Sequence, residues 1–310
     1  MTRQSDIKSI IFEHNREFYE KYKDEYFLDK AHMMLSLMAN AEEHVKILNN
    51  GFEIGKIKAN KGDYSTSEIL EIAKKELVVN SYHCIETLFR LLIAHIRDSQ
   101  TPWIGVEQIR NFRKFKEDVS LIIDKKFFLN SHDEEISKIF FGVRESFNGM
   151  TNVEWEKNIK NTNELLQRFG NELLELNDYN THKHGAALIN TEFGVRLGDG
   201  SIIDADLQDT FMYITSKIEN KSKEKTEIQI NKTFKFMKWE EKYANTYFAT
   251  QLIKNMLNIS RLKLGITKEA KLSSLHTLDV TKIFKTGIVL NTMDEPLFQR
   301  VIVKNEAHRT

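Results

Sequence analysis

Proline is almost absent from this chain, and its scarcity limits how often a helix is forced to break. Only 2 of the 310 residues are proline, and only 13 are glycine. Proline removes a backbone hydrogen-bond donor, and glycine costs about 1 kcal/mol in a helix interior. A chain poor in both residues can form long, uninterrupted helices, so we expect a mostly α-helical protein.

The segment from residue 66 to about Arg97 has the strongest helix signal. Ser65 is expected to cap its start, because Glu68 follows three residues later and completes a capping box. The apolar residues of its second half are Leu77, Val78, Val79, Tyr82, Ile85, Leu88, Phe89, Leu91, Leu92 and Ile93. They surround the helix on nearly all sides, a pattern typical of a helix buried in a core.

The rest of the first 185 residues also favours helices. Residues 1–60 show helical patterning with a break at Asn49-Asn50-Gly51, a second helix is expected over 106–125, and 126–152 look less regular. From Val153 to Leu176, apolar residues recur at intervals of seven, as in a helix that packs along a seam against other helices. These signals predict a helical bundle.

Beyond residue 185 the apolar pattern changes period. Gly198-Asp199-Gly200 predicts a hairpin turn, and residues 210–218 and 226–236 alternate like paired strands. A long helix is expected over 238–264, with short strands at 287–290 and 300–303. We therefore expect a helical domain over 1–185 and a small mixed β/α region over 186–310. The fold class is a helical bundle followed by a small antiparallel sheet with a long helix, α+β overall.

Composition restricts the function. Lys plus Arg and Asp plus Glu are both 45, which argues against a surface that coats nucleic acid but leaves room for a local basic pocket. Cys84 is the only cysteine, so a disulfide within the chain and a cysteine-based zinc site are excluded. The first residues lack an apolar signal core, and no uninterrupted apolar run approaches the roughly 18 residues of a membrane span. We expect a cytoplasmic protein with no membrane partner, no cofactor and no metal.

One short segment, Tyr179-Asn180-Thr181-His182-Lys183-His184-Gly185, carries residue types suited to chemistry on a phosphodiester. In a helix Asn180 and His184 lie on one face, four residues apart, with Lys183 beside them. An amide, a cation and an imidazole together could hold a phosphate and move a proton. The alternative is structural, because asparagine and glycine often end helices and basic side chains are favourable there.

The segment resembles the motif of HEPN domains, helical modules of prokaryotic defence and toxin systems, whose motif commonly reads Arg-Asn-x-x-x-His-Gly. It matches at Asn180, His184 and Gly185 and departs at Tyr179, where the family has the arginine that grips the scissile phosphate. The resemblance covers about residues 66–185 and implies RNA as ligand and a homodimer with composite sites at its interface. The segment is also similar to Asn-x-x-Lys-His-Gly in uncharacterised bacterial proteins, a resemblance that assigns no activity.

Polar residues form a stripe along the predicted buried helix. They are Asn80, His83, Thr87, Arg90 and Arg97, with Glu86 adjacent. One interpretation is a structural network or a solvent-facing edge. The other is a composite site, in which Arg90 supplies the cation that Tyr179 cannot and Glu86 orients a histidine. Arg90 and His95 also match the spacing Arg-x-x-x-x-His, but five residues place them about 140° apart on a helix, so we interpret this match as coincidence.

Two hypotheses follow for the function. In the first, the protein is a metal-independent ribonuclease in bacterial phage defence: His184 activates the ribose 2′-hydroxyl, Asn180 positions the phosphate, and Lys183 or Arg90 stabilises its charge. In the second, the protein is a catalytically silent helical module that recognises RNA or a protein partner. The missing arginine favours the second hypothesis, and the retained Asn180 and His184 favour the first.

Overall fold

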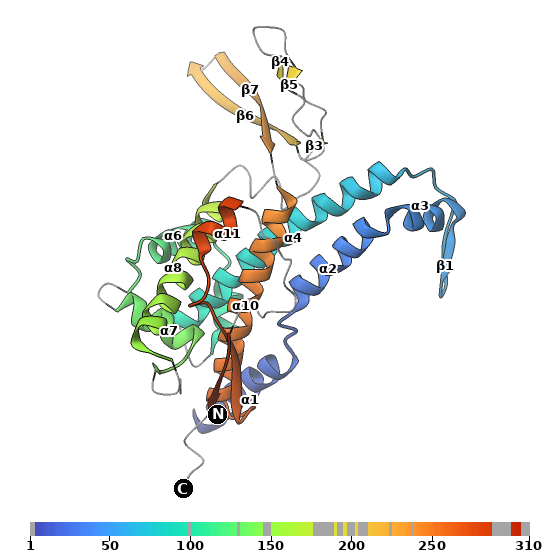
Figure 1. Cartoon of the computed structure of the whole chain (residues 1–310). Helices are drawn as coiled ribbons and strands as arrows, with labels where there is room; N and C mark the ends of the chain where they lie inside the picture. Colours follow the sequence, from blue (N-terminus) through green and yellow to red (C-terminus); the bar gives the residue numbers. More distant parts are fainter. Residues whose placement is uncertain are drawn as a thin grey trace. The chain divides into compact units, whose positions relative to one another are not determined.

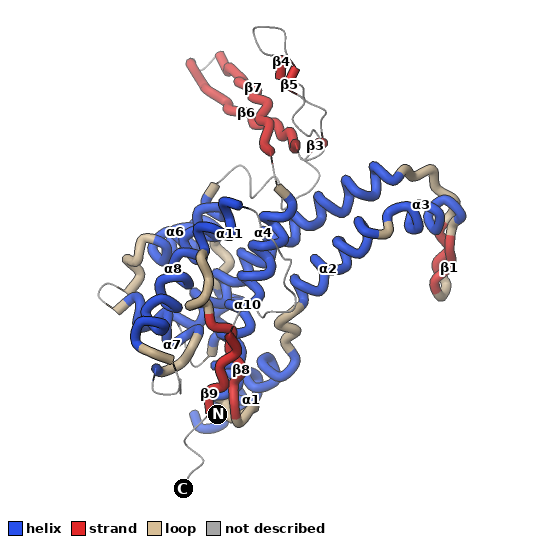
Figure 2. Tube along the Cα trace, in the orientation of Figure 1, coloured by secondary structure: helices blue, strands red, loops and turns tan. Residues whose placement is uncertain are grey.

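The computed structural model describes most of the chain, and helices dominate it (Figure 1; Figure 2). The described residues are 4–97, 101–128, 131–144, 150–175, 189–190, 195–196, 202–203, 210–222, 225–236, 238–286 and 299–304. Contacts group the chain into two compact units, one of residues 1–28, 83–174 and 244–310 and one of residues 29–82 and 175–243. Each unit thus contains segments from both sides of residue 185, and that predicted boundary itself lies outside the described residues.

The first unit is a helical bundle with one two-stranded antiparallel sheet. Its elements are α1 (Gln4–Lys21), the second half of α4 (Thr66–Arg97), α5 (Pro102–Gln108), α6 (Phe112–Ile123), α7 (His132–Phe140), α8 (Asn152–Leu174), most of α10 (Trp239–Lys263), β8 (Glu269–Ser274), α11 (Val280–Thr286) and β9 (Gln299–Lys304). Strands β8 and β9 are antiparallel, with Glu269 opposite Lys304. The predicted strand near residue 300 and the long helix over 238–264 are confirmed, and residues 287–290 lie outside the described part.

The second unit combines helices with short antiparallel sheets. Its elements are most of α2 (Tyr26–Ala39), α3 (Ala41–Asn50), β1 (Phe52–Ile54), β2 (Ile57–Ala59), the first half of α4, β3 (Ile189–Asn190), β4 (Val195–Arg196), β5 (Ile202–Ile203), β6 (Thr210–Ser222), β7 (Lys225–Phe236) and the start of α10. Strands β6 and β7 pair from Thr210 and Phe236 to Ser222 and Lys225, as the alternating pattern predicts. The fold class, mostly helical with a small antiparallel sheet and a long helix, is confirmed.

Helix α4 begins where the sequence predicts. The Ser65 backbone N–H donates to Glu68 Oε2 at 2.7 Å, and the Glu68 N–H donates to Ser65 Oγ at 3.2 Å, which closes the capping box. Among the described helices, α4 alone is long and apolar enough to cross a membrane by length and composition, but 78% of its most apolar 18-residue window is buried inside the protein. The burial of Ile85, Leu88 and Phe89, all at 0% exposure, is that of a core helix.

Three sequence predictions need correction. The helix expected over 106–125 is two helices, α5 and α6, because the Asn111 side chain caps a new start by accepting from the Lys114 N–H at 3.1 Å. The predicted break at Asn49-Asn50-Gly51 is confirmed, but the residues after it form the hairpin β1–β2 and are not helical. The stretch expected to be irregular contains α7, which starts immediately after Ser131.

Helices α6 and α8 approach closely at a glycine. A Cβ atom on Gly170 would lie 2.4 Å from Ile123 Cγ2 and 3.3 Å from both Phe89 Cζ and Val119 Cγ1. Helix α8 buries its predicted seam here, with Leu166, Phe169 and Leu173 at 1% exposure or less. Glycine therefore lets α8 pack against α6 and α4 without a gap.

We predict that Gly170→Ala lowers the free energy of unfolding by about 1–3 kcal/mol, because the overpacking exceeds the helix propensity that alanine gains. Urea unfolding measures this change. The control is Asn171→Ala on the exposed side of the same turn, which gains the propensity without a clash. Equal or higher stability of Gly170→Ala would contradict the close approach.

Candidate functional site

The motif that resembles HEPN domains lies outside the described residues, with Asn180, Lys183 and His184 in it. Helix α8 ends at Leu174, and Glu175 is already outside a helix. Asn180 and Gly185 are therefore not the residues that end α8.

Glu86 and Arg90, the two described residues of the predicted site, bind each other in the core of the first unit. Arg90 Nε and Nη2 lie 2.8 Å and 2.6 Å from Glu86 Oε1. Arg90 Nη1 donates to the Ile109 carbonyl at 2.5 Å, and the guanidinium lies 4.8 Å from the centre of the Phe115 ring. The Glu86 side chain is only 9% exposed, so it needs the paired charge. These contacts are those of a structural network.

We predict that Arg90→Met destabilises the protein by about 3–5 kcal/mol, because it takes the neighbouring positive charge away from the buried Glu86 carboxylate. The double variant Glu86→Gln with Arg90→Met removes that carboxylate as well and should recover part of the loss. Urea unfolding of the three proteins forms a double-mutant cycle. A single variant as stable as the wild type would show that Arg90 is not held for structure.

His95, the second residue of the Arg-x-x-x-x-His spacing, belongs to a different network from Arg90. Its Nδ1 lies 2.7 Å from the Leu91 carbonyl, and its Nε2 lies 2.8 Å from the Tyr19 hydroxyl and 3.1 Å from Ser260 Oγ. A carbonyl only accepts, so Nδ1 carries the proton and Nε2 accepts. Burial lowers the pKa of His95 to about 4 and raises that of Tyr19 to about 12. The network joins α1, α4 and α10, and the motif-like spacing is coincidental.

We predict that acid destabilises the protein through His95. The pKa of this imidazole is higher in the unfolded protein than in the folded one, so protons bind the unfolded state first. The free energy of unfolding is therefore highest above about pH 6.5, falls as the pH is lowered, and levels off below about pH 4. Between about pH 7.5 and about pH 4.5 this loss amounts to about 2–3 kcal/mol. Urea midpoints for the wild type and His95→Gln isolate it, because every other group titrates in both. Identical pH dependence would contradict a buried neutral imidazole.

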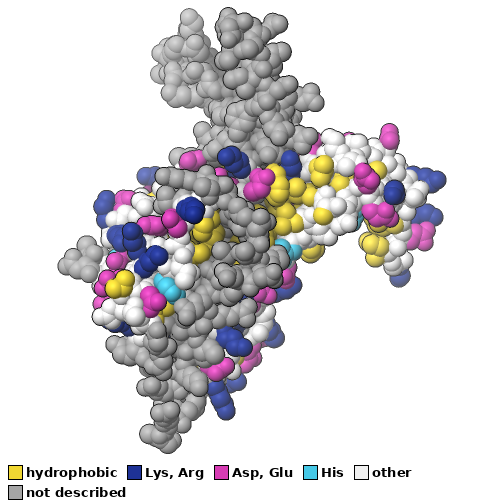
Figure 3. All heavy atoms as spheres, viewed as in Figure 1, with side chains coloured by type: hydrophobic (Ala, Val, Ile, Leu, Met, Phe, Trp, Pro, Cys, Tyr) yellow, Lys and Arg dark blue, Asp and Glu magenta, His cyan; other side chains and the backbone are white. Residues whose placement is uncertain are grey.

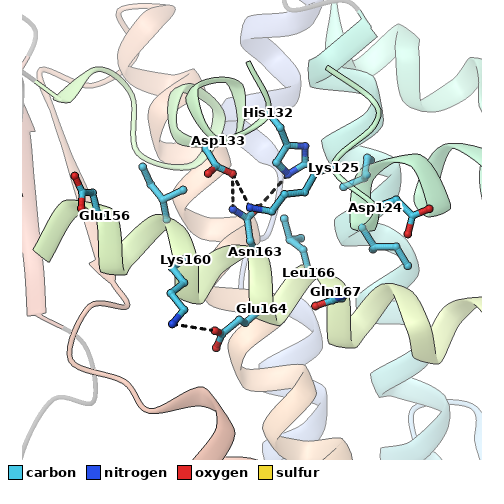
Figure 4. Close-up of a pocket in the computed structure, with 13 residues that line it drawn as sticks. Asp124, Lys125, His132, Asp133, Glu156, Lys160, Asn163, Glu164, Leu166 and Gln167 are labelled. Atoms are coloured by element: carbon cyan, nitrogen blue, oxygen red, sulfur yellow. Dashed lines mark hydrogen bonds and ion pairs between the residues drawn. The ribbon is translucent and has the colours of Figure 1, made fainter. Parts of the chain in front are cut away.

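A pocket formed by α6, α7 and α8 is the best candidate site among the described residues (Figure 4). Its cavity volume is about 610 Å³, within the range of small-molecule sites. It is lined by Ile122, Ile123, Asp124, Lys125, His132, Asp133, Glu156, Ile159, Lys160, Asn163, Glu164, Leu166 and Gln167. We call it the α6–α8 pocket.

One chain of polar contacts crosses this pocket, and Figure 4 shows its members pointing toward one another. Lys125 Nζ donates to Asp133 Oδ1 at 3.0 Å, and Asn163 Nδ2 donates to the same oxygen at 2.8 Å. Asn163 Oδ1 lies 3.1 Å from His132 Nε2. Because the Asn163 amide oxygen only accepts, His132 Nε2 carries the proton and Nδ1 carries the lone pair.

Burial and neighbouring groups set the charges of Asp133 and His132. Burial opposes ionisation of Asp133, but the hydrogen bonds and charge of Lys125 and the Asn163 amide outweigh it and lower the pKa of that carboxyl. Burial also lowers the pKa of His132, more than its bond to Asn163 raises it. At neutral pH the pocket therefore presents an ionised aspartate and a neutral imidazole.

Two features of the pocket are unfavourable for folding. Lys125 has φ +58° at the end of α6, where helices usually place glycine, and such a conformation costs about 1–2 kcal/mol. His132 Nδ1 is buried without a hydrogen-bond partner among the described residues, which costs about 1–3 kcal/mol. Unfavourable groups gathered at one cavity are typical of functional sites.

Sequence reasoning missed this pocket. Ser131-His132-Asp133 could have been noticed as a helix start, since serine often caps helices. Asn163 gives no such signal, because it sits among other polar residues on the outer side of a regular helix. The contacts join residues some thirty positions apart, and no local pattern encodes them.

Comparisons with models of protein families, with curated proteins and with solved structures found no match to this chain.

Proposed function

We propose that this protein is a HEPN-like helical binding module without ribonuclease activity, and that its ligand binds in the α6–α8 pocket. The observation that carries the proposal is the contact chain Lys125–Asp133–Asn163–His132 across a cavity of about 610 Å³. Every charge and amide in that chain is oriented before a ligand arrives. Such preorganisation favours binding, because less ordering remains to be done on association.

The state of Arg90 supports the absence of catalysis. A HEPN-like nuclease needs a cation on the scissile phosphate, and Tyr179 cannot supply one. Arg90, which the sequence offered as a replacement, binds Glu86 and the Ile109 carbonyl instead. Moving it to a phosphate would take its positive charge away from the buried Glu86 carboxylate.

Charge supports a ligand other than RNA at the pocket. Asp124, Asp133, Glu156 and Glu164 line it, against only Lys125 and Lys160. On the face drawn in Figure 3, cationic and anionic side chains alternate over the region of α6, α7 and α8 without a continuous basic patch. A phosphate backbone needs concentrated cations, so it is repelled here.

We predict that the purified protein does not cleave a mixed, end-labelled RNA pool in the presence of a chelator, and that His184→Ala behaves identically. Gel separation of the labelled fragments measures cleavage. Cleavage by the wild type that disappears in His184→Ala would overturn the proposal in favour of a nuclease.

A metal-independent ribonuclease is the second candidate function, because Asn180, His184 and Gly185 keep the matching spacing and do not form the end of α8. In this case Lys183 would stabilise the phosphate in place of the missing arginine. This candidate carries with it the homodimer and the phage-defence role that the HEPN resemblance implies.

A further inference from the structure

The α6–α8 pocket carries more negative than positive charge at its surface. Its lining holds four carboxylates and two lysines, and His132 is neutral. Both lysines are already paired, Lys125 with Asp133 at 3.0 Å and Lys160 with Glu164 at 3.8 Å. Asp124 pairs at 3.1 Å with Lys126, which lies outside the lining, so Glu156 is the one lining carboxylate that has no ion pair with the described residues.

Two of the carboxylates have capacity left for a ligand. Both contacts to Asp133 fall on Oδ1, so Oδ2 accepts no recorded hydrogen bond from the described residues. Glu156 has no ion-pair partner within the described part of the chain. It lies on the same helix as Lys160 and Glu164, which pair with each other at 3.8 Å.

The rest of the pocket lining is apolar. Ile123 and Ile159 are partly exposed there, and Ile122 and Leu166 close it from behind at 1% exposure each. A ligand with a hydrocarbon stem can bury that stem against the isoleucines and hold a charged end at the carboxylates. Lysine and arginine side chains and small organic amines have this form.

We propose, on the basis of the proposed function, that the α6–α8 pocket binds an organic cation, an amine or guanidine on an apolar stem. The ammonium group donates to Asp133 Oδ2, Glu156 adds an uncompensated negative charge to the same pocket, and the stem packs on Ile123 and Ile159. Lys125 and Asn163 hold the Asp133 carboxylate ionised and in place. Charge-assisted hydrogen bonds of this kind are about twice as strong as neutral ones.

Three probes with the same six-carbon stem test the charge: hexylamine, hexan-1-ol and hexanoate. Each is titrated into the full-length protein at neutral pH and low salt, and binding is followed by the NMR signal of the His132 ring Cε1–H. The His132→Gln variant identifies that signal among the ten histidines. We expect hexylamine to shift it saturably, with an affinity at least about tenfold above that of the other two probes.

Two isosteric variants give a matched comparison in the first turn of α7. Asp133→Asn should weaken hexylamine binding by about tenfold. Glu134→Gln removes the same charge one residue further on, outside the pocket lining, and should leave the affinity unchanged. Equal weakening by both variants would mean that only the net charge of the protein matters, and it would overturn the proposal that the ammonium group binds Asp133.

A blocked tripeptide with a central lysine distinguishes the source of the cation. Binding as tight as that of hexylamine identifies a protein side chain, and binding of the free amine alone identifies a small molecule; both uphold the cation. If hexan-1-ol or hexanoate bound as tightly as hexylamine, the preference for a cationic ligand would be overturned, although the pocket would still be a binding site. No shift with any probe would overturn the pocket and the proposed function together.

Discussion

The first unit depends on burying the second half of α4, a helix that is apolar on nearly every side. No single neighbour can cover such a helix, so it must lie at the centre of a bundle. Four neighbours contact it by different means. Helix α1 binds through the Tyr19 hydroxyl at His95, and α5 packs where Gly105 approaches Ala94. Helix α6 forms an ion pair from Asp118 to Arg97, and α10 contacts the buried Cys84 thiol through Thr250. The positions of α6 and α8, and so of the pocket between them, follow from this central helix.

A central apolar helix tolerates polar groups only when each of them is matched. Glu86 is buried against the Arg90 guanidinium, and His95 gives up its charge and accepts from the Tyr19 hydroxyl. The α6–α8 pocket follows the opposite rule. There Lys125 and His132 are kept in arrangements that cost stability, at a cavity open to solvent. That contrast within one bundle separates side chains that hold the fold from side chains available to a ligand.

Signals carried by a few neighbouring residues made most of the fold predictable. The capping box at Ser65, the seven-residue spacing on α8 and the alternation on β6 and β7 each act over one element, and each prediction is confirmed. The hairpin after Gly51 and the separate start of α6 at Asn111 were missed, although both have local signals that a long helical pattern overrode. The pocket was beyond prediction for another reason. Its members come from the end of one helix, the start of a second and the middle of a third, and only the packing of α6 on α8 brings them together.

Electrostatics separates the two candidate sites of this chain. The motif segment contains Lys183 and two histidines and suits a phosphate, whereas the α6–α8 pocket has an excess of carboxylates and suits a cation. A single ligand group cannot satisfy both, because a charge attracted by one is repelled by the other. The binding module and the ribonuclease are therefore distinct hypotheses about distinct ligands. A cation bound in the pocket would not exclude cleavage of RNA by the motif segment. Likewise, a motif segment without nuclease activity would not exclude binding in the pocket.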